Sequence, residues 1–240
     1  KTSHLGTLDP QVTGVLPVAL SRACRLNEYL MHRDKTYVGI MRVHKEIAKE
    51  KLTEIIEKFI GKITQLPPVR SRVKREERIR EVKTFKILEI EGSDILFESQ
   101  VQAGTYIRKL IHDIGKQIEG AHMLELRRTQ AGIFNESTSI NLYEFEKIVE
   151  KYKNGNERPL REIIIPGEIV ASLLPIIKIR KDVVKKLLTG SPIFSSFLAE
   201  DIPELQEGEK IAVLADDRFI GCYKFIGKED LLAKPEFVKN

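Results

Sequence analysis

The chain of 240 residues has no tryptophan, only two cysteines and no apolar run of the roughly 20 residues that a bilayer-spanning helix requires. Cys24 and Cys222 lie far apart and form no CxxC pair, so we expect two reduced thiols rather than a disulfide or a redox pair. The first residues, KTSH, are charged or polar and are not followed by the apolar stretch of a signal peptide. These absences favour an intracellular protein without a membrane anchor.

Motifs for metal and nucleotide chemistry are also missing. The five histidines form no HExxH or comparable ligand spacing, so we expect no metal site. The phosphate-binding pattern GxxxxGK[ST] does not occur, which argues against a nucleoside triphosphatase. The sequence therefore predicts a protein that works without a metal or a cofactor.

Positive charge is concentrated in one part of the chain. The net charge is +5, and residues 1–165 hold 29 Lys and Arg against 23 Asp and Glu, whereas residues 166–240 hold 11 against 12. The densest stretch, VRSRVKREERIR, carries two acids and six basic residues, Arg70, Arg72, Lys74, Arg75, Arg78 and Arg80. Such a stretch favours an anionic partner, nucleic acid first. The alternative is a solvated surface rich in Lys and Glu.

Hydrophobic periodicity predicts an α+β fold, with a mixed, mainly antiparallel sheet, followed by a small β-barrel-like domain. The polar stretch NGNERP and the change in charge balance place the boundary between them, giving domains at 1–165 and 172–240. In the first domain we expect strands at 36–43 and 122–131 and a hairpin of 85–92 with 94–101. We also expect three helices: one at 52–60 that Gly61 closes, one at 105–118 that Thr105 caps, and one at 141–152 whose apolar face points inward. In the second we expect strands at 176–180, 210–215 and 219–225 and a helix at 181–190.

The stretch HLGTLDP raises the question of what Asp9 does. An Asp directly before a proline, between Gly6 and Gly14, is typical of a turn in which the carboxylate bonds the local backbone. A catalytic carboxylate on a stiff loop would have the same surroundings. Arg108, in AGTYIRKLIHDIG, could keep such a carboxylate ionised and oriented, although it could equally be a surface cation.

Five motifs occur together in one order: HLGTLDPQVTGVLPVAL, KTYVGIMRVH, PPVRSRVKREERIR, AGTYIRKLIHDIG and GAHMLELRRTQAG. In this combination the chain resembles the TruB-type pseudouridine synthases over nearly its whole length. It is most similar to their archaeal and eukaryotic branch, the dyskerin-like catalytic subunit of H/ACA guide-RNA particles. The resemblance implies a cofactor-free isomerase that converts uridine in RNA to pseudouridine, with roles in tRNA and rRNA processing and ribosome biogenesis.

The resemblance assigns roles to individual residues. Asp9 matches the catalytic aspartate, Arg108 the arginine that pairs with it, and Tyr37 the tyrosine that packs on the target base and takes part in proton handling. His4 and Leu126 match residues of the substrate pocket. Without the resemblance, Tyr37 would be read as a strand aromatic, Leu126 as core and His4 as a partner of the loop backbone. The stretch from about Leu66 to Arg80 corresponds to a mobile thumb loop over the RNA, and residues from about 172 to a PUA module that binds RNA.

The expected partners are a guide RNA, rRNA, tRNA and the small accessory proteins of the H/ACA particle, in an archaeal-like cytoplasm or a eukaryotic nucleolus. Two other functions stay open: a stand-alone tRNA pseudouridine synthase, and a non-catalytic RNA-binding subunit that keeps the fold. The family carries a further N-terminal segment with a KPxG-type motif, so we expect a part of the protein that precedes Lys1.

Overall fold

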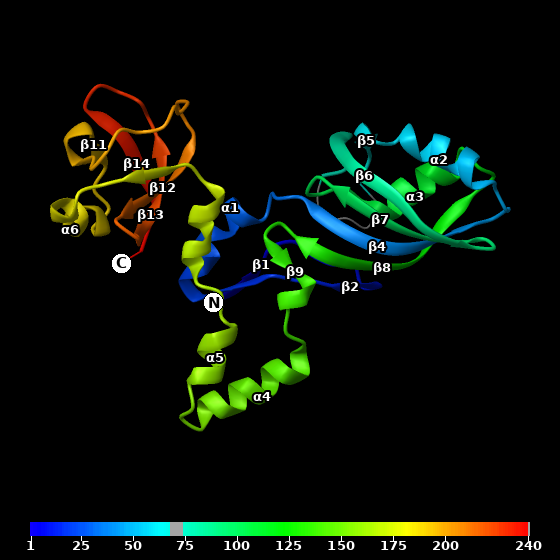
Figure 1. Ribbon diagram of the computed structural model, residues 1–240, viewed down its shortest axis with the longest axis horizontal. Coiled ribbons are helices and arrows are strands. Elements are labelled where there is room, and N and C mark those ends of the chain that lie inside the picture. The colour runs from blue at the N-terminus through cyan, green and yellow to red at the C-terminus, as the bar shows by residue number, and fades with distance from the viewer. Residues whose placement is uncertain (68–73, 240) are drawn as a thin grey trace. The chain divides into compact units, whose positions relative to one another are not determined.

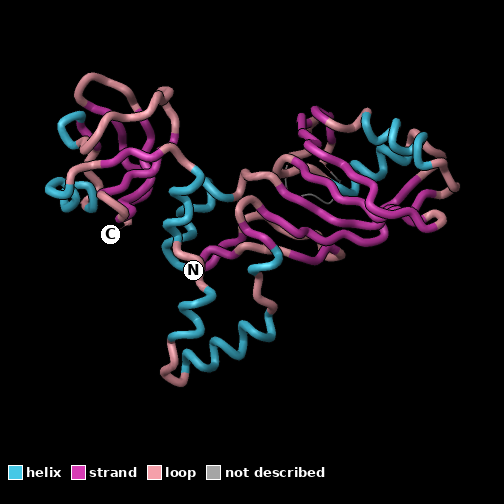
Figure 2. Tube along the Cα trace, in the orientation of Figure 1, coloured by secondary structure: helices cyan, strands magenta, loops and turns pink. Residues whose placement is uncertain are grey.

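The computed structural model describes residues 1–67 and 74–239, and it confirms the predicted α+β class (Figure 1). Helices and strands alternate irregularly along the chain, as the trace coloured by secondary structure shows (Figure 2). Two compact units are formed, one of Lys1–Leu20 with Leu30–Leu142 and one of Ser21–Tyr29 with Tyr143–Asn240. None of the helices within the described ranges is long and apolar enough to span a membrane.

The first unit is built on a mixed sheet with a short two-stranded ribbon beside it. Its strands follow the order β2-β8-β4-β7-β6-β5, with β9 on β8, and all pairs are antiparallel except β2 with β8. The sheet strands are β2 Val12–Gly14, β4 Lys35–Val43, β5 Gly61–Gln65, β6 Arg78–Glu91, β7 Asp94–Val101, β8 Ala121–Ala131 and β9 Phe134–Asn135, and the ribbon pairs β1 Thr2–His4 with β3 Val18–Leu20. The mixed, mainly antiparallel sheet and the predicted 85–101 hairpin are thereby confirmed.

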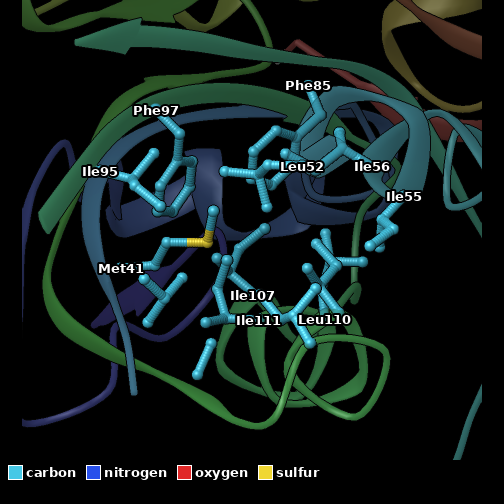
Figure 3. Packing of buried hydrophobic residues seen from close by; sticks show 14 of the residues in the cluster. Met41, Leu52, Ile55, Ile56, Phe85, Ile95, Phe97, Ile107, Leu110 and Ile111 are labelled. Atoms are coloured by element: carbon cyan, nitrogen blue, oxygen red, sulfur yellow. The ribbon is translucent and has the colours of Figure 1, made fainter. Parts of the chain in front are cut away.

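Two helices, α2 (Lys49–Glu57) and α3 (Ile107–Gly115), bury their apolar faces against one side of this sheet. The core between them is formed by side chains such as Met41, Leu52, Phe97 and Leu110, each fully buried (Figure 3). In β7 every second residue is buried, as expected for a strand with one face on a core. This packing joins β4, β8 and α3, the elements that carry the site described below, around one core.

Helix α3 begins two residues later than its sequence pattern predicts, and its predicted cap is wrong. The Thr105 hydroxyl donates to the carbonyl of Gln102 (2.8 Å) and caps nothing. Instead, the buried amide of Gln65 pairs with the backbone of Tyr106 in both directions: Tyr106 N–H donates to Oε1 (3.0 Å) and Nε2 donates to the Tyr106 carbonyl (3.2 Å). A side chain from β5 thus fixes the start of the helix.

Two other local expectations are also wrong. Gly61 does not close the preceding helix, which ends at Glu57; with φ +95° it is the first residue of β5. The helix α4 (Leu142–Lys153) lies where it was predicted, but its expected inner face is only partly covered: Phe145, Ile148 and Val149 are partly buried, and Leu142 is 82% exposed. Periodicity determined where this helix forms, but it did not determine whether its apolar face is covered.

The second unit holds a five-stranded sheet, β10-β12-β13-β14-β11, parallel only between β10 and β12. The strands surround a separate apolar cluster that includes the buried Tyr223 and Leu187. The strands of this unit are β10 Ile176–Lys178, β11 Ile193–Phe194, β12 Lys210–Ala215, β13 Arg218–Phe225 and β14 Leu231–Val238, and its α-helices of five or more residues are α4, α5 Arg158–Ile163 and α6 Val184–Leu188. A β-rich C-terminal unit was predicted and is found.

The segment Ser21–Tyr29 belongs to the second unit although it lies between β3 and β4 in the chain. The Tyr29 hydroxyl donates to the Glu236 carboxylate (2.6 Å), Arg25 donates to the Glu236 carbonyl (3.1 Å), and Arg22 to that of Val238 (3.2 Å). These contacts with β14 are distant in sequence, so composition could not indicate them. The boundary predicted between 165 and 172 stays a prediction about functional domains.

Candidate active site

The loop that carries Asp9 runs from β1 to β3 and is closed by backbone hydrogen bonds. Leu5 N–H donates to the Pro17 carbonyl (2.9 Å), and Val12 N–H donates to the carbonyl of Asp9 itself (2.9 Å). Gly6 (φ +127°) and Gly14 (φ +104°) take conformations that other residues rarely adopt. A tight turn is therefore present, as the residue types predicted, and the side chain of Asp9 is left at its exposed tip.

Asp9 pairs with Arg108 from the first turn of α3. Arg108 Nη2 lies 3.0 Å from Asp9 Oδ2, and both side chains are about half exposed. The two residues are almost a hundred positions apart, and it is the packing of α3 on the sheet that brings them together. A guanidinium at this distance holds the carboxylate in one orientation through a charge-assisted hydrogen bond.

Arg128, on β8, lies beneath the Asp9 loop and is 2% exposed. Its Nε donates to the Val15 carbonyl (2.8 Å), Nη2 to that of Gly6 (2.9 Å) and Nη1 to that of Thr7 (3.4 Å). Sequence reasoning did not single out this residue. The only signal was its place in LELRR, where the alternation of a strand sends the two arginines to opposite faces.

Tyr37, on β4, lies next to Arg128 in the register of β4 with β8 and packs against the core. Burial raises the pKa of its hydroxyl, and the nearby charge and hydrogen bond of Arg128 act in the opposite direction; the carboxylate of Asp9 raises the pKa further. The phenol is therefore close enough to both charged groups to respond to them. The structure brings Asp9, Arg108, Tyr37 and Arg128 into one site.

Lys35, two residues before Tyr37, is a second buried cation in this region. It is 5% exposed, and its ammonium group donates to the carbonyls of Met31 (2.9 Å) and Arg33 (2.6 Å). Burial, and then the charge of Arg128, lower the pKa of Lys35 to about 8. Sequence reasoning missed this residue, because a lysine at the start of a strand is usually exposed.

The two predicted pocket residues differ in their surroundings. Leu126 is 7% exposed and belongs to the core, but it also stands opposite Val12 of β2 and Gly39 of β4 in the sheet. His4 Nδ1 accepts a hydrogen bond from the backbone of Gly6 (3.4 Å). The structure thus shows both in the roles that sequence reasoning gave as alternatives, core packing and loop support, and their roles toward a substrate stay predictions.

The basic stretch is only partly described. Arg70 and Arg72 lie outside the described residues. Lys74 lies 3.0 Å from a Glu76 carboxylate oxygen and Arg78 3.5 Å from the other, and Arg75 is exposed. The Arg80 guanidinium lies against the backbone of Gly104, just before α3, so that a methyl group there would meet it at 3.2 Å. In the described part of the chain no three potential metal-ligating side chains cluster.

Comparison with family models identifies the regions that carry this site. Residues 1–107 match the model of the TruB family pseudouridylate synthase (N terminal domain). Residues 108–171 match that of the tRNA pseudouridylate synthase B C-terminal domain. Asp9, Tyr37 and the whole basic stretch fall in the first match, and Arg108 and Arg128 fall in the second.

Similar proteins cover most of this chain. A "Probable tRNA pseudouridine synthase B" of Methanothermobacter thermautotrophicus is 39% identical over 89% of this chain and 67% of its own length, and its namesake in Methanopyrus kandleri is 41% identical over 89% and 64%. The chain thus spans about two thirds of these relatives.

Solved structures agree with the sequence relatives. A crystal structure of a Cbf5-Nop10-Gar1 complex matches 100% of this chain and 76% of the matched chain with a TM-score of 0.87 and 37% identity. A structure of an H/ACA RNP bound to a substrate RNA containing 2'-deoxyuridine matches 99% of this chain and 76% of the matched chain, with a TM-score of 0.87 and 35% identity. With these matches and the Asp9–Arg108 pair in its matched regions, the chain belongs to the TruB family of pseudouridine synthases.

Proposed function

We propose that this chain is the catalytic part of an RNA pseudouridine synthase and that Asp9 is its catalytic carboxylate. The observation that carries the proposal is the Asp9–Arg108 pair, which holds an accessible carboxylate at the tip of a stiff loop (3.0 Å). The family membership and the names of the relatives support the same reaction. The position of Tyr37, within electrostatic reach of Asp9, supports a site that receives a planar base.

The reaction breaks the bond between C1′ of ribose and N1 of uracil, turns the base and forms a bond from C1′ to C5, after which the C5 proton leaves and N1 takes up a proton. No atoms are gained or lost. Asp9 would act as a nucleophile or as a stabiliser of the developing charge. Arg108 would hold this carboxylate aimed at the substrate, and Tyr37 would stack on the flipped uracil and handle the proton. Leu126 and His4 would line the pocket.

We propose RNA as the partner of the basic stretch and of the C-terminal unit. Arg70, Arg72, Lys74, Arg75, Arg78 and Arg80 would contact phosphates, which makes binding strongly salt-dependent. Residues 172–240 of the C-terminal unit would act as a PUA module. The protein would act in the cytoplasm.

Two substrate classes are supported by separate observations. The names of the curated relatives support a tRNA substrate, and the structural similarity to Cbf5 complexes supports guide-directed modification of rRNA with small protein partners. We favour a guide-directed enzyme that also modifies the tRNA T-loop. Turnover of a transcribed tRNA by the protein alone, compared with guide-dependent turnover of an rRNA fragment, separates these uses.

The test of the reaction itself is release of tritium from RNA labelled at C5 of uridine. We expect release by the wild type and none by Asp9→Asn, with RNA binding retained. Asp113→Asn is the matched control, because this carboxylate pairs with Lys109 on α3 and with Lys116 directly after it, not with Arg108. Equal release by Asp9→Asn and wild type would remove Asp9 from the chemistry. RNA binding without release by the wild type would favour a non-catalytic RNA-binding subunit.

A further inference from the structure

We propose that Arg128 is a positioning residue of this site: its guanidinium ties the two arms of the Asp9 loop together and so sets where the carboxylate points. This role deepens the proposed function and rests on it. Arg128 does not contact Asp9. It acts through the loop backbone, on which the direction of the carboxylate depends.

The hydrogen bonds of Arg128 reach both sides of Asp9. Gly6 and Thr7, whose carbonyls accept from the two terminal nitrogens, precede Asp9 in the chain, and Val15, which accepts from Nε, follows it. The guanidinium is planar and its donors form a fixed fork, so it holds these carbonyls in a defined arrangement. A single side chain thereby closes the loop from below.

The backbone of Arg128 contributes to the same clamp. Val15 N–H donates to the Arg128 carbonyl (2.8 Å), and Gly14 stands opposite Arg128 in the parallel pairing of β2 with β8. This approach is so close that a methyl group on Gly14 would lie 2.1 Å from the Arg128 carbonyl oxygen. Both the main chain and the side chain of one residue therefore hold the loop.

A gain in stability does not explain why the charge of Arg128 is buried. Arg128 is 2% exposed, and the acceptors of its guanidinium in the Asp9 loop are carbonyls rather than a carboxylate. The buried cation Lys35 lies beside the same loop, its Cε 3.9 Å from where a Cβ of Gly6 would stand, with Arg128 Nη1 at 3.7 Å. Removing a cation from water is unfavourable when no opposite charge compensates for the lost hydration. A loop held in a functional shape gives this arrangement a physical use that packing does not.

The neighbouring Arg127 provides a control within the same strand. Its side chain is 59% exposed, on the opposite face of β8, and pairs with the carboxylate of Glu136. Both arginines carry the same charge at adjacent positions, yet only Arg128 reaches the Asp9 loop. Variants of the two residues therefore separate loop positioning from a general loss of positive charge.

The experiment compares Arg128→Met, Arg128→Lys and Arg127→Met in the full chain. Amide hydrogen exchange of residues 4–17 is measured first. We expect the methionine variant of Arg128 to lose protection at Leu5, Val12 and Val15, and Arg127→Met to keep it. Arg128→Lys retains the charge and one donor group, so we expect intermediate protection, and this variant also tests the role if the methionine variant does not fold.

Turnover and binding of uridine-containing RNA are then measured on the same samples. We expect kcat to fall about 100-fold in Arg128→Met and about 10-fold in Arg128→Lys, while the Kd for RNA stays within about threefold of the wild type. Unchanged exchange in residues 4–17, or a kcat equal to that of Arg127→Met, overturns the proposal. Because exchange is read without turnover, an inactive wild type counts against the proposed function, while the exchange data still decide whether Arg128 holds the loop.

Discussion

Replacing Arg108 by methionine should separate the catalytic from the structural importance of the Asp9–Arg108 pair. The two charged atoms lie 3.0 Å apart, and the side chains are 55% and 51% exposed. In water, Coulomb's law gives about 1.4 kcal/mol at this distance, and exposed pairs contribute about 0.2–1 kcal/mol to stability once ordering of the side chains is included. We therefore expect Arg108→Met to lower the free energy of unfolding by about 0.5 kcal/mol.

The expected effect on activity is much larger. Without Arg108, the Asp9 carboxylate loses the group that orients it, and misplacement of a reacting group by about 1 Å can cost roughly 100-fold in rate. We expect kcat to fall about 100- to 1000-fold, which corresponds to about 3–4 kcal/mol in the activation barrier. RNA binding should weaken only slightly, since a single cation changes the salt slope by at most about one unit.

Single-turnover tritium release, RNA binding and thermal unfolding measure these three effects on the same protein. Lys109→Met is the matched control, because Lys109 is the next residue of α3 and also forms an ion pair. In this variant the partner of Lys109, Asp113, still has its second ion pair, with Lys116. A kcat within threefold of the wild type would refute the catalytic importance of the pair. A Tm lowered by more than about 8 °C would show that the pair mainly stabilises the fold, because 1 kcal/mol corresponds to about 2–4 °C at this size.

Three further predictions concern stability. Gly14→Ala should lower the free energy of unfolding by more than about 2 kcal/mol and abolish turnover, because the methyl group would overlap the backbone of β8 at 2.1 Å. Gly155 is also at positive φ but has open space beside it, so Gly155→Ala should lower the free energy of unfolding, measured by chemical denaturation, by only about 1 kcal/mol. The pKa of Lys35 falls from 10.5 to about 8 on folding, so the unfolded chain binds the extra proton between these values. The stability of the wild type relative to Lys35→Met should therefore rise as pH increases from 8 to 10.5, by on the order of 3 kcal/mol, and a flat or falling difference in urea denaturation would contradict the burial of this charge. Leu110→Ala should lower stability by about 2–5 kcal/mol and Leu142→Ala by less than about 0.5 kcal/mol, because Leu110 is fully buried and Leu142 is 82% exposed; similar costs would refute the assigned core.

Local patterns predicted the elements well but their ends less well. The strand 36–43 and the 85–101 hairpin were found because alternation and a Gly-containing turn act within a few residues. The start of α3 was mispredicted because its first residue outside the helix, Tyr106, is held by the side chain of Gln65, 41 positions away, and Thr105 bonds back to Gln102. The burial of α4 was overpredicted, since its apolar face is only partly covered. A period of 3.6 residues shows that a helix is amphipathic but does not show what packs against it.

The sequence by itself determined the family, the α+β class and the candidate pair of Asp9 with Arg108, because motifs and periodicity are local properties of the chain. Only the tertiary structure showed that Arg128 lies under the Asp9 loop, with acceptors 113 to 122 positions away, and that Lys35 is buried beside it. A cation looks the same in a sequence whether it is solvated or buried. Its environment, and with it its pKa and its partners, is decided when β2, β4 and β8 pair and exclude water from the space between the sheet and the loop.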